Sequence, residues 1–100
     1  MTKLQARFDE FQKLAFPKLG KQVGDFPLYD SLIAGAVMTI LSGRNIASKE
    51  LPILDCESTQ FIHALRKKVN MSPDEVAFLQ YCEALEELNQ LALQEVDGAT

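Results

Sequence analysis

The chain contains 100 residues, of which 47% are hydrophobic and 24% are charged, and its formal net charge is −4. Intrinsic disorder requires low hydrophobicity together with high charge, so this composition excludes it. A chain of this length and apolar content forms one domain. We therefore expect a single folded domain over residues 1–100.

The charge is distributed unevenly along the chain. Residues 1–50 hold seven Lys or Arg and five Asp or Glu, a net charge of +2. Residues 51–100 hold three Lys or Arg and nine Asp or Glu, a net charge of −6, and neither Lys nor Arg occurs from Met71 onward. This asymmetry is the most unusual feature of the sequence.

Two features of the sequence predict a cytoplasmic protein. The opening MTKLQARFDEF contains Asp9 and Glu10 and lacks the apolar run of a signal peptide. The two cysteines, Cys56 and Cys82, are too few for a disulfide framework, and their spacing does not match a zinc site. We expect both to be reduced and mostly buried.

The first predicted helix covers residues 2–16. Its apolar residues recur at helical spacing and form one narrow stripe, made of Leu4, Phe8, Phe11 and Ala15. We expect Pro17 to end this helix, because proline disfavours helical geometry in the residue before it.

The second predicted helix covers residues 28–42 and carries no charge in its last dozen positions. A helix that is apolar all round is buried on all sides, and this one is shorter than the roughly 20 residues needed to cross a bilayer. We therefore place it centrally. Small side chains recur every four residues, at Ser31, Gly35, Thr39 and Gly43. Such a ridge lets another helix approach closely, and Gly43 also suits the left-handed position after a helix end.

The third predicted helix begins near Asp55, a plausible N-cap. Its expected buried stripe consists of Phe61, Ile62, Leu65 and Val69. His63 lies away from that stripe, so we expect it to face solvent. The helix closes with three cations at residues 66–68, which complement the helix dipole and offer an alternative role in binding.

The fourth predicted helix has the clearest start, because residues 72–75 read Ser-Pro-Asp-Glu, with an N-cap serine, proline at the first helical position and glutamate at the third. It should extend to about Val96, roughly 35 Å at 1.5 Å per residue. Its apolar residues cover an arc of roughly 200° and are Phe78, Tyr81, Cys82, Ala84, Leu85, Leu88, Leu91, Ala92 and Leu93. That arc is too wide for one neighbour, so it predicts either two helices packed on it or one helix and a second copy in a homodimer.

The opposite face of the fourth helix is acidic. Glu83 stands three and four residues before Glu86 and Glu87, an arrangement in which like charges repel. Solvent, the cations of residues 66–68 and of the first helix, or a basic surface on a partner would each relieve this repulsion. We take Glu83, Glu86, Glu87 and Gln90 as the candidate partner-binding residues.

The sequence offers little material for catalysis or metal binding. His63 is the only histidine, and Cys56, seven residues earlier, would lie about 10 Å away along a helix, beyond hydrogen-bond reach. The patterns of helical di-iron sites, zinc proteases and EF-hands are absent. We expect no enzymatic activity, no cofactor and no metal.

Residues 64–77, ALRKKVNMSPDEVA, resemble the opening of phage-repressor-type helix-turn-helix domains. In that family a basic helix end, a short turn and an acid-capped helix lead to a recognition helix. The resemblance implies a small DNA-binding regulator as the alternative function. The sequence departs from the family after residue 77, since no glycine turn follows Leu79 and the would-be recognition segment carries Glu83, Glu86 and Glu87, which phosphates repel.

These patterns together predict an all-α fold, a compact bundle of about four helices with a central apolar second helix and a long acidic C-terminal helix. The expected function is that of a non-enzymatic interaction or regulatory protein, of inhibitor or immunity type, whose acidic helix meets a partner with a basic surface. Complementary charge of this kind speeds encounter and selects partners more than it adds affinity.

Overall fold

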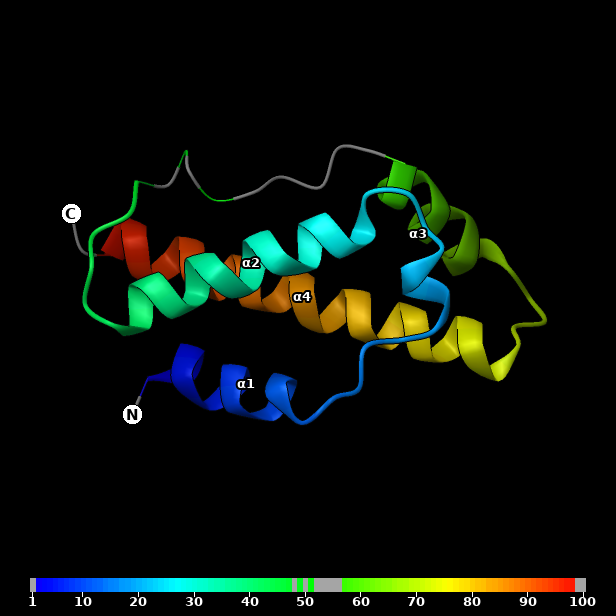
Figure 1. The fold of residues 1–100 in the computed structure, drawn as a ribbon, viewed down its shortest axis with the longest axis horizontal. Coiled ribbons are helices and arrows are strands. Elements are labelled where there is room, and N and C mark those ends of the chain that lie inside the picture. Colours follow the sequence, from blue (N-terminus) through cyan, green and yellow to red (C-terminus); the bar gives the residue numbers. More distant parts are fainter. Residues whose placement is uncertain (1, 48, 50, 52–56, 99–100) are drawn as a thin grey trace.

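The computed structural model describes residues 2–47, 49, 51 and 57–98, with side chains up to residue 96 in the last helix. Within these residues the chain is all-α and has no strand (Figure 1). The elements are helix α1 (Lys3–Gln12), the 3-10 turn η1 (Leu19–Lys21), helix α2 (Phe26–Leu41), helix α3 (Glu57–Lys67) and helix α4 (Pro73–Gly98). The predicted bundle of about four helices is confirmed.

Helix α4 organises the bundle. It packs against α1, α2 and α3, and at 26 residues it sets the long dimension of a molecule measuring 43 × 25 × 20 Å. Figure 1 shows α2 running along α4, with α1 beside them and α3 near the start of α4. Helix α4 therefore contributes to most of the contacts between helices.

Local hydrogen bonds cap both ends of helix α1. The Thr2 hydroxyl caps its first turn by accepting from the Gln5 N–H at 3.1 Å. The predicted stripe is confirmed for Leu4, Phe8 and Phe11, which are buried.

The prediction that α1 continues to residue 16 is wrong, because the helix ends at Gln12 and Ala15 is exposed. After the end of the helix, the Phe16 ring packs against the core. Its centroid lies 5.6 Å from that of Phe26 and 5.5 Å from that of Tyr81. Burying this aromatic ring stabilises the fold more than one further helical turn would, since the outward face of that turn would be polar.

Helix α2 ends as its sequence predicts. Gly43 has φ +85°, in the left-handed region. The Gly43 N–H donates to the Ile40 carbonyl at 3.1 Å and the Arg44 N–H donates to the Thr39 carbonyl at 3.2 Å. These are the two bonds of a Schellman motif, so Gly43 satisfies carbonyls that the helix end leaves open.

The prediction that α2 is buried on all sides is wrong. One face packs on α1 and α4 and contains Phe26, Tyr29, Ile33, Ala36 and Val37. The other face leaves Leu28, Leu32 and Met38 exposed to solvent. An apolar composition shows that burial would be favourable, but the number of neighbours depends on where the other helices lie.

Helix α3 is anchored by a residue far away in sequence. Asp25, just before α2, accepts from the Ser58 N–H at 3.1 Å and from the Ser58 hydroxyl at 2.8 Å. The predicted cap at Asp55 lies outside the described residues. Ile62 and Leu65 are buried as predicted. The prediction that Val69 belongs to the core is wrong, because Val69 follows the helix end and is 92% exposed.

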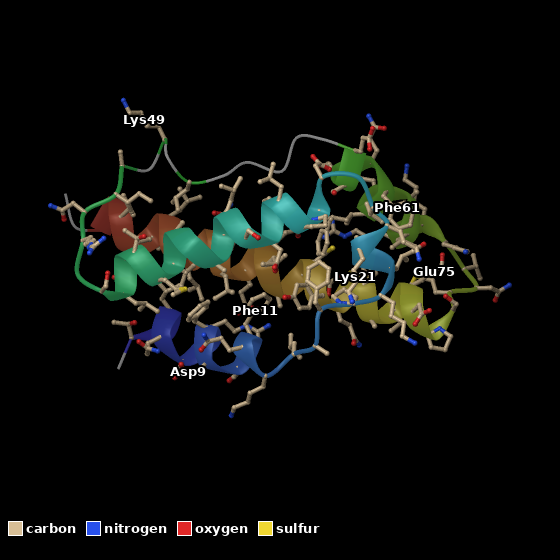
Figure 2. All side chains as sticks on the ribbon, viewed as in Figure 1. Asp9, Phe11, Lys21, Lys49, Phe61 and Glu75 are labelled. Carbon is tan, nitrogen blue, oxygen red and sulfur yellow. The ribbon has the colours of Figure 1, made fainter. Side chains whose placement is uncertain are left out.

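Helix α4 starts with the predicted capping box. The Glu75 N–H donates to the Ser72 hydroxyl at 3.3 Å, and the Ser72 N–H donates to Glu75 Oε1 at 2.9 Å. Lys68 adds an ion pair with Glu75 at 2.7 Å, and this contact, more than any other, lowers the pKa of the Glu75 carboxyl. Figure 2 shows Glu75 at this end of the bundle. The cation therefore ties the end of α3 to the start of α4.

The wide apolar arc of α4 is covered within the chain. Phe78, Tyr81, Cys82, Ala84, Leu85, Leu88 and Ala92 are all buried. The rings of Phe26 and Phe78 lie 4.7 Å apart and those of Phe11 and Tyr81 lie 4.9 Å apart, which joins α2 and α1 to α4. Several helices packed on α4 therefore explain the arc, and a homodimer through α4 stays a prediction.

Candidate functional site

An open groove of about 520 Å³ runs over α4 beside α2. The side chains that line it are Tyr29, Glu83, Glu86, Glu87, Asn89, Gln90 and Leu93. All four candidate residues from the sequence, three glutamates and Gln90, belong to this set. The helical spacing of 83, 86, 87 and 90 brings them to one face of α4 because the helix continues without a break through residues 80–83.

Two of the three glutamates are paired inside the molecule. Arg66 Nη2 lies 2.8 Å from Glu86 Oε2, and Arg7 Nη2 lies 2.9 Å from Glu87 Oε2. The repulsion between the glutamates of α4 could be relieved by solvent, by cations of the same chain or by a partner. For Glu86 and Glu87, the structure shows arginines of α3 and α1 in this role. Each arginine engages one carboxylate oxygen, so neither pair is bidentate.

Glu83 differs from its two neighbours. It is exposed, and in the part of the chain that the structure describes no Lys or Arg lies within ion-pair distance of its carboxylate. A carboxylate without a counter-ion on an acidic face is where an added cation gains most. Glu83 therefore carries the unrelieved negative charge of the groove.

The rest of the lining is apolar or neutral. Leu93 is half-buried and offers carbon surface, Tyr29 lines the groove from a buried position, and Asn89 and Gln90 offer amide groups. Carboxylates next to apolar surface suit lysine and arginine, whose aliphatic stems pack on carbon while their charged ends bond to oxygen. The groove has the chemistry to accept a basic side chain.

The sequence prediction of this site did not include Arg7, Tyr29, Asn89 or Leu93. Arg7 bridges Glu10 Oε2 through Nη1 and Glu87 Oε2 through Nη2, both at 2.9 Å. A second, smaller groove of about 320 Å³ lies beside this bridge, between α1 and α4. The sequence does contain a signal for Arg7. This residue directly precedes Phe8, which belongs to the buried stripe of α1, and its side chain reaches Glu87 on the neighbouring helix α4.

Two further titratable side chains, Cys82 of α4 and Asp30 of α2, are buried or half-buried. Burial, followed by the charge of Glu86, raises the pKa of the Cys82 thiol to about 12, which keeps it protonated and unreactive. Burial raises the pKa of Asp30, whose carboxylate accepts from the Tyr81 hydroxyl at 3.0 Å. His63 is exposed as predicted, and Cys56 lies outside the described residues. The prediction of a buried thiol is confirmed for Cys82.

No set of three His, Cys, Asp or Glu side chains able to hold a metal occurs among the residues described here. None of the described helices is both long and apolar enough to cross a membrane.

The basic segment at the end of α3 is mostly engaged within the chain. Arg66 pairs with Glu86 and Lys68 pairs with Glu75. Helix α4 continues through residues 80–83, where a helix-turn-helix domain would begin its recognition helix. The likeness of residues 64–77 to such domains therefore extends no further than the turn and the capped helix start.

Comparison of the chain with models of known protein families, with curated proteins and with solved structures found no match.

Proposed function

We propose that this protein is a non-enzymatic interaction or regulatory protein whose acidic groove on α4 binds a basic segment of a partner protein. The observation that supports this most is Glu83, a carboxylate without an ion pair among the described residues, set beside Glu86, Glu87 and the carbon surface of Leu93. A lysine or arginine of the partner supplies the missing counter-charge.

The internal arginines prepare the groove for this role. Arg66 and Arg7 hold the Glu86 and Glu87 side chains in place through one oxygen each. Both pairs are partly exposed, and pairs of this kind contribute at most about 1 kcal/mol, so a partner can compete for the same carboxylates. Charge complementarity then steers the encounter and gives the binding its sensitivity to salt.

The partner that fits is a protein with exposed lysines or arginines, such as an enzyme with a basic active site that an inhibitor or immunity-type protein covers. A cytoplasmic location belongs to this proposal and is supported by the low cysteine content and by the free Cys82. Helix-turn-helix DNA binding is less well supported, because α4 continues unbroken where a recognition helix would begin and carries Glu83, Glu86 and Glu87 there, which phosphates repel.

The test uses an arginine-rich peptide as a probe and the single variant Glu83→Gln. Wild-type protein should bind the peptide at low salt and lose it at high salt, with amide chemical-shift changes concentrated at Tyr29, Glu83, Gln90 and Leu93. Glu83→Gln should weaken binding severalfold, because it removes the groove's unpaired charge.

The matched control is Glu95→Gln, which removes the same charge from an exposed position of α4 outside the groove. It should change the affinity much less than Glu83→Gln does. Equal effects of the two variants, or unchanged binding when Glu83, Glu86 and Glu87 are all replaced by Gln, contradict a groove-specific site. A gel shift with duplex DNA at low salt should remain negative, and a shift lost in Arg66→Gln would favour the DNA-binding alternative.

A further inference from the structure

The outer face of α2 is an apolar surface on which none of the described residues packs. Leu28, Leu32 and Met38 are 62%, 50% and 58% exposed. The helix has one charged residue, Asp30, which faces the interior and bonds to Tyr81. Three large apolar side chains on a charge-free helix face are typical of a surface that a partner covers.

Two hydroxyls on this face are bonded to the backbone of α2 itself. The Thr39 hydroxyl donates to the Gly35 carbonyl at 2.8 Å, and the Ser42 hydroxyl donates to the Thr39 carbonyl at 2.9 Å. Hydroxyls already bonded to the backbone lose little when water is removed. The face can therefore be covered at a low desolvation cost, despite its serine and threonine residues.

No described residue packs closely against Gly35 in the single chain. A Cβ atom added there would meet nothing within 4 Å, and glycine in the middle of a helix is less stable than alanine. A glycine on an exposed helix face becomes useful when a second helix crosses it closely, because it lets the two backbones approach. This is an observation about α2 independent of the exposure of its leucines.

The face is symmetric about Gly35, which identifies the partner. Leu32 and Met38 stand three residues before and after it, and Ser31 and Thr39 stand four residues before and after it. When a two-fold axis sets two such helices antiparallel with Gly35 at the crossing, Leu32 of one copy lies beside Thr39 of the other. Met38 likewise lies beside Ser31, so each large side chain meets a small one, as an isologous interface requires.

The chain as a whole exposes 6449 Å², more than the about 5,700 Å² usual for a folded monomer of 11.2 kDa. Association of two copies through this face would lower the exposed area.

We propose that two copies of this chain form an antiparallel dimer through the outer face of α2, with Gly35 at the point where the two helices cross. The interface is built from Leu28, Ser31, Leu32, Gly35, Met38 and Thr39. This proposal does not depend on the acidic groove, whose lining residues in α4 are separate from this face.

The test measures the mass of the full chain by sedimentation velocity between about 1 and 200 µM. Wild-type protein should be dimeric at the upper concentrations. Gly35→Glu should weaken the dimer more than tenfold, because it places a side chain and a charge at the crossing. Since the added Cβ meets no neighbour in the single chain, helix content and the melting transition of the monomer should be retained.

The matched control is Ala64→Glu, an equal charge added at an exposed position of α3, which should leave the dimer unchanged. A monomer at 200 µM overturns the proposal. So does a dimer that persists in Gly35→Glu, since the interface then lies elsewhere, for example on α4.

Cross-linking tests the orientation in a Cys56→Ser background. Gly35→Cys should form an intermolecular disulfide on oxidation. Ser31→Cys should not, because in the antiparallel pair the two copies of residue 31 lie eight residues apart along the axis, about 12 Å. Efficient cross-linking at both positions indicates a parallel pair and overturns the antiparallel arrangement.

Discussion

At the scale of single residues, two glycines with opposite surroundings show how neighbours decide the effect of one methyl group. A Cβ on Gly20 would lie 2.9 Å from two atoms of the Phe26 ring and 3.3 Å from the Phe16 ring, whereas a Cβ on Gly35 would meet nothing. Phe26 is fully buried, so its ring has no free space into which to move. The short turn η1 therefore needs glycine in order to lie against the aromatic cluster.

We expect Gly20→Ala to destabilise the fold by about 1–3 kcal/mol, the usual cost of overpacking a close-packed core. The matched change Gly35→Ala should stabilise it by about 1 kcal/mol, because it improves helix propensity without a clash. Urea denaturation at low protein concentration, followed by circular dichroism, compares the two variants with the wild type. Equal effects of the two substitutions would contradict the packing described around Gly20.

At the scale of elements, the ends of the helices divide into those set locally and those set by distant residues. The starts of α1 and α4 and the end of α2 use bonding partners within five residues, at Thr2, at Ser72 with Glu75, and at Gly43. The start of α3 uses Asp25, which is 33 residues away from Ser58. The sequence reasoning found the caps of α4 and α2 and missed Asp25, since no local pattern marks a cap supplied by another segment.

We expect Asp25→Ala to destabilise the protein by about 1–2 kcal/mol, because the buried Ser58 hydroxyl and the Ser58 N–H lose their acceptor. Amide hydrogen exchange should accelerate most in the first turn of α3. Asp25→Asn keeps an acceptor oxygen and should retain a larger part of the stability. Uniform acceleration of exchange across all four helices would show that Asp25 does not act on α3 in particular.

At the scale of the whole molecule, some of the negative charges of α4 form ion pairs with arginines of other helices. Arg7 of α1 and Arg66 of α3 both reach glutamates in the middle of α4. The net charges of +2 and −6 for the two halves of the sequence predict such an attraction, but not which glutamates it uses. Glu83 stays outside these contacts among the described residues, and for that reason it is central to the proposed binding groove.

We expect Arg7→Gln to strengthen binding of the arginine-rich peptide severalfold, because it releases Glu87 into the groove. The same variant should lose less than about 1 kcal/mol of stability, since the Arg7 pairs are partly exposed. Fluorescence anisotropy of the labelled peptide measures the first effect, and urea denaturation measures the second. Weaker peptide binding by Arg7→Gln would contradict competition between internal and external cations.

The sequence by itself determined the features that depend on neighbouring residues: the all-α class, the capping box of α4, the left-handed Gly43, and the single face shared by Glu83, Glu86, Glu87 and Gln90. Helical periodicity and capping act over a few residues, so the pattern is sufficient to predict them. Only the tertiary structure decided the early end of α1, the exposed outer face of α2 and the arginine partners of Glu86 and Glu87. Each of these depends on which segments meet in space, because burial and ion pairing join residues that lie far apart along the chain.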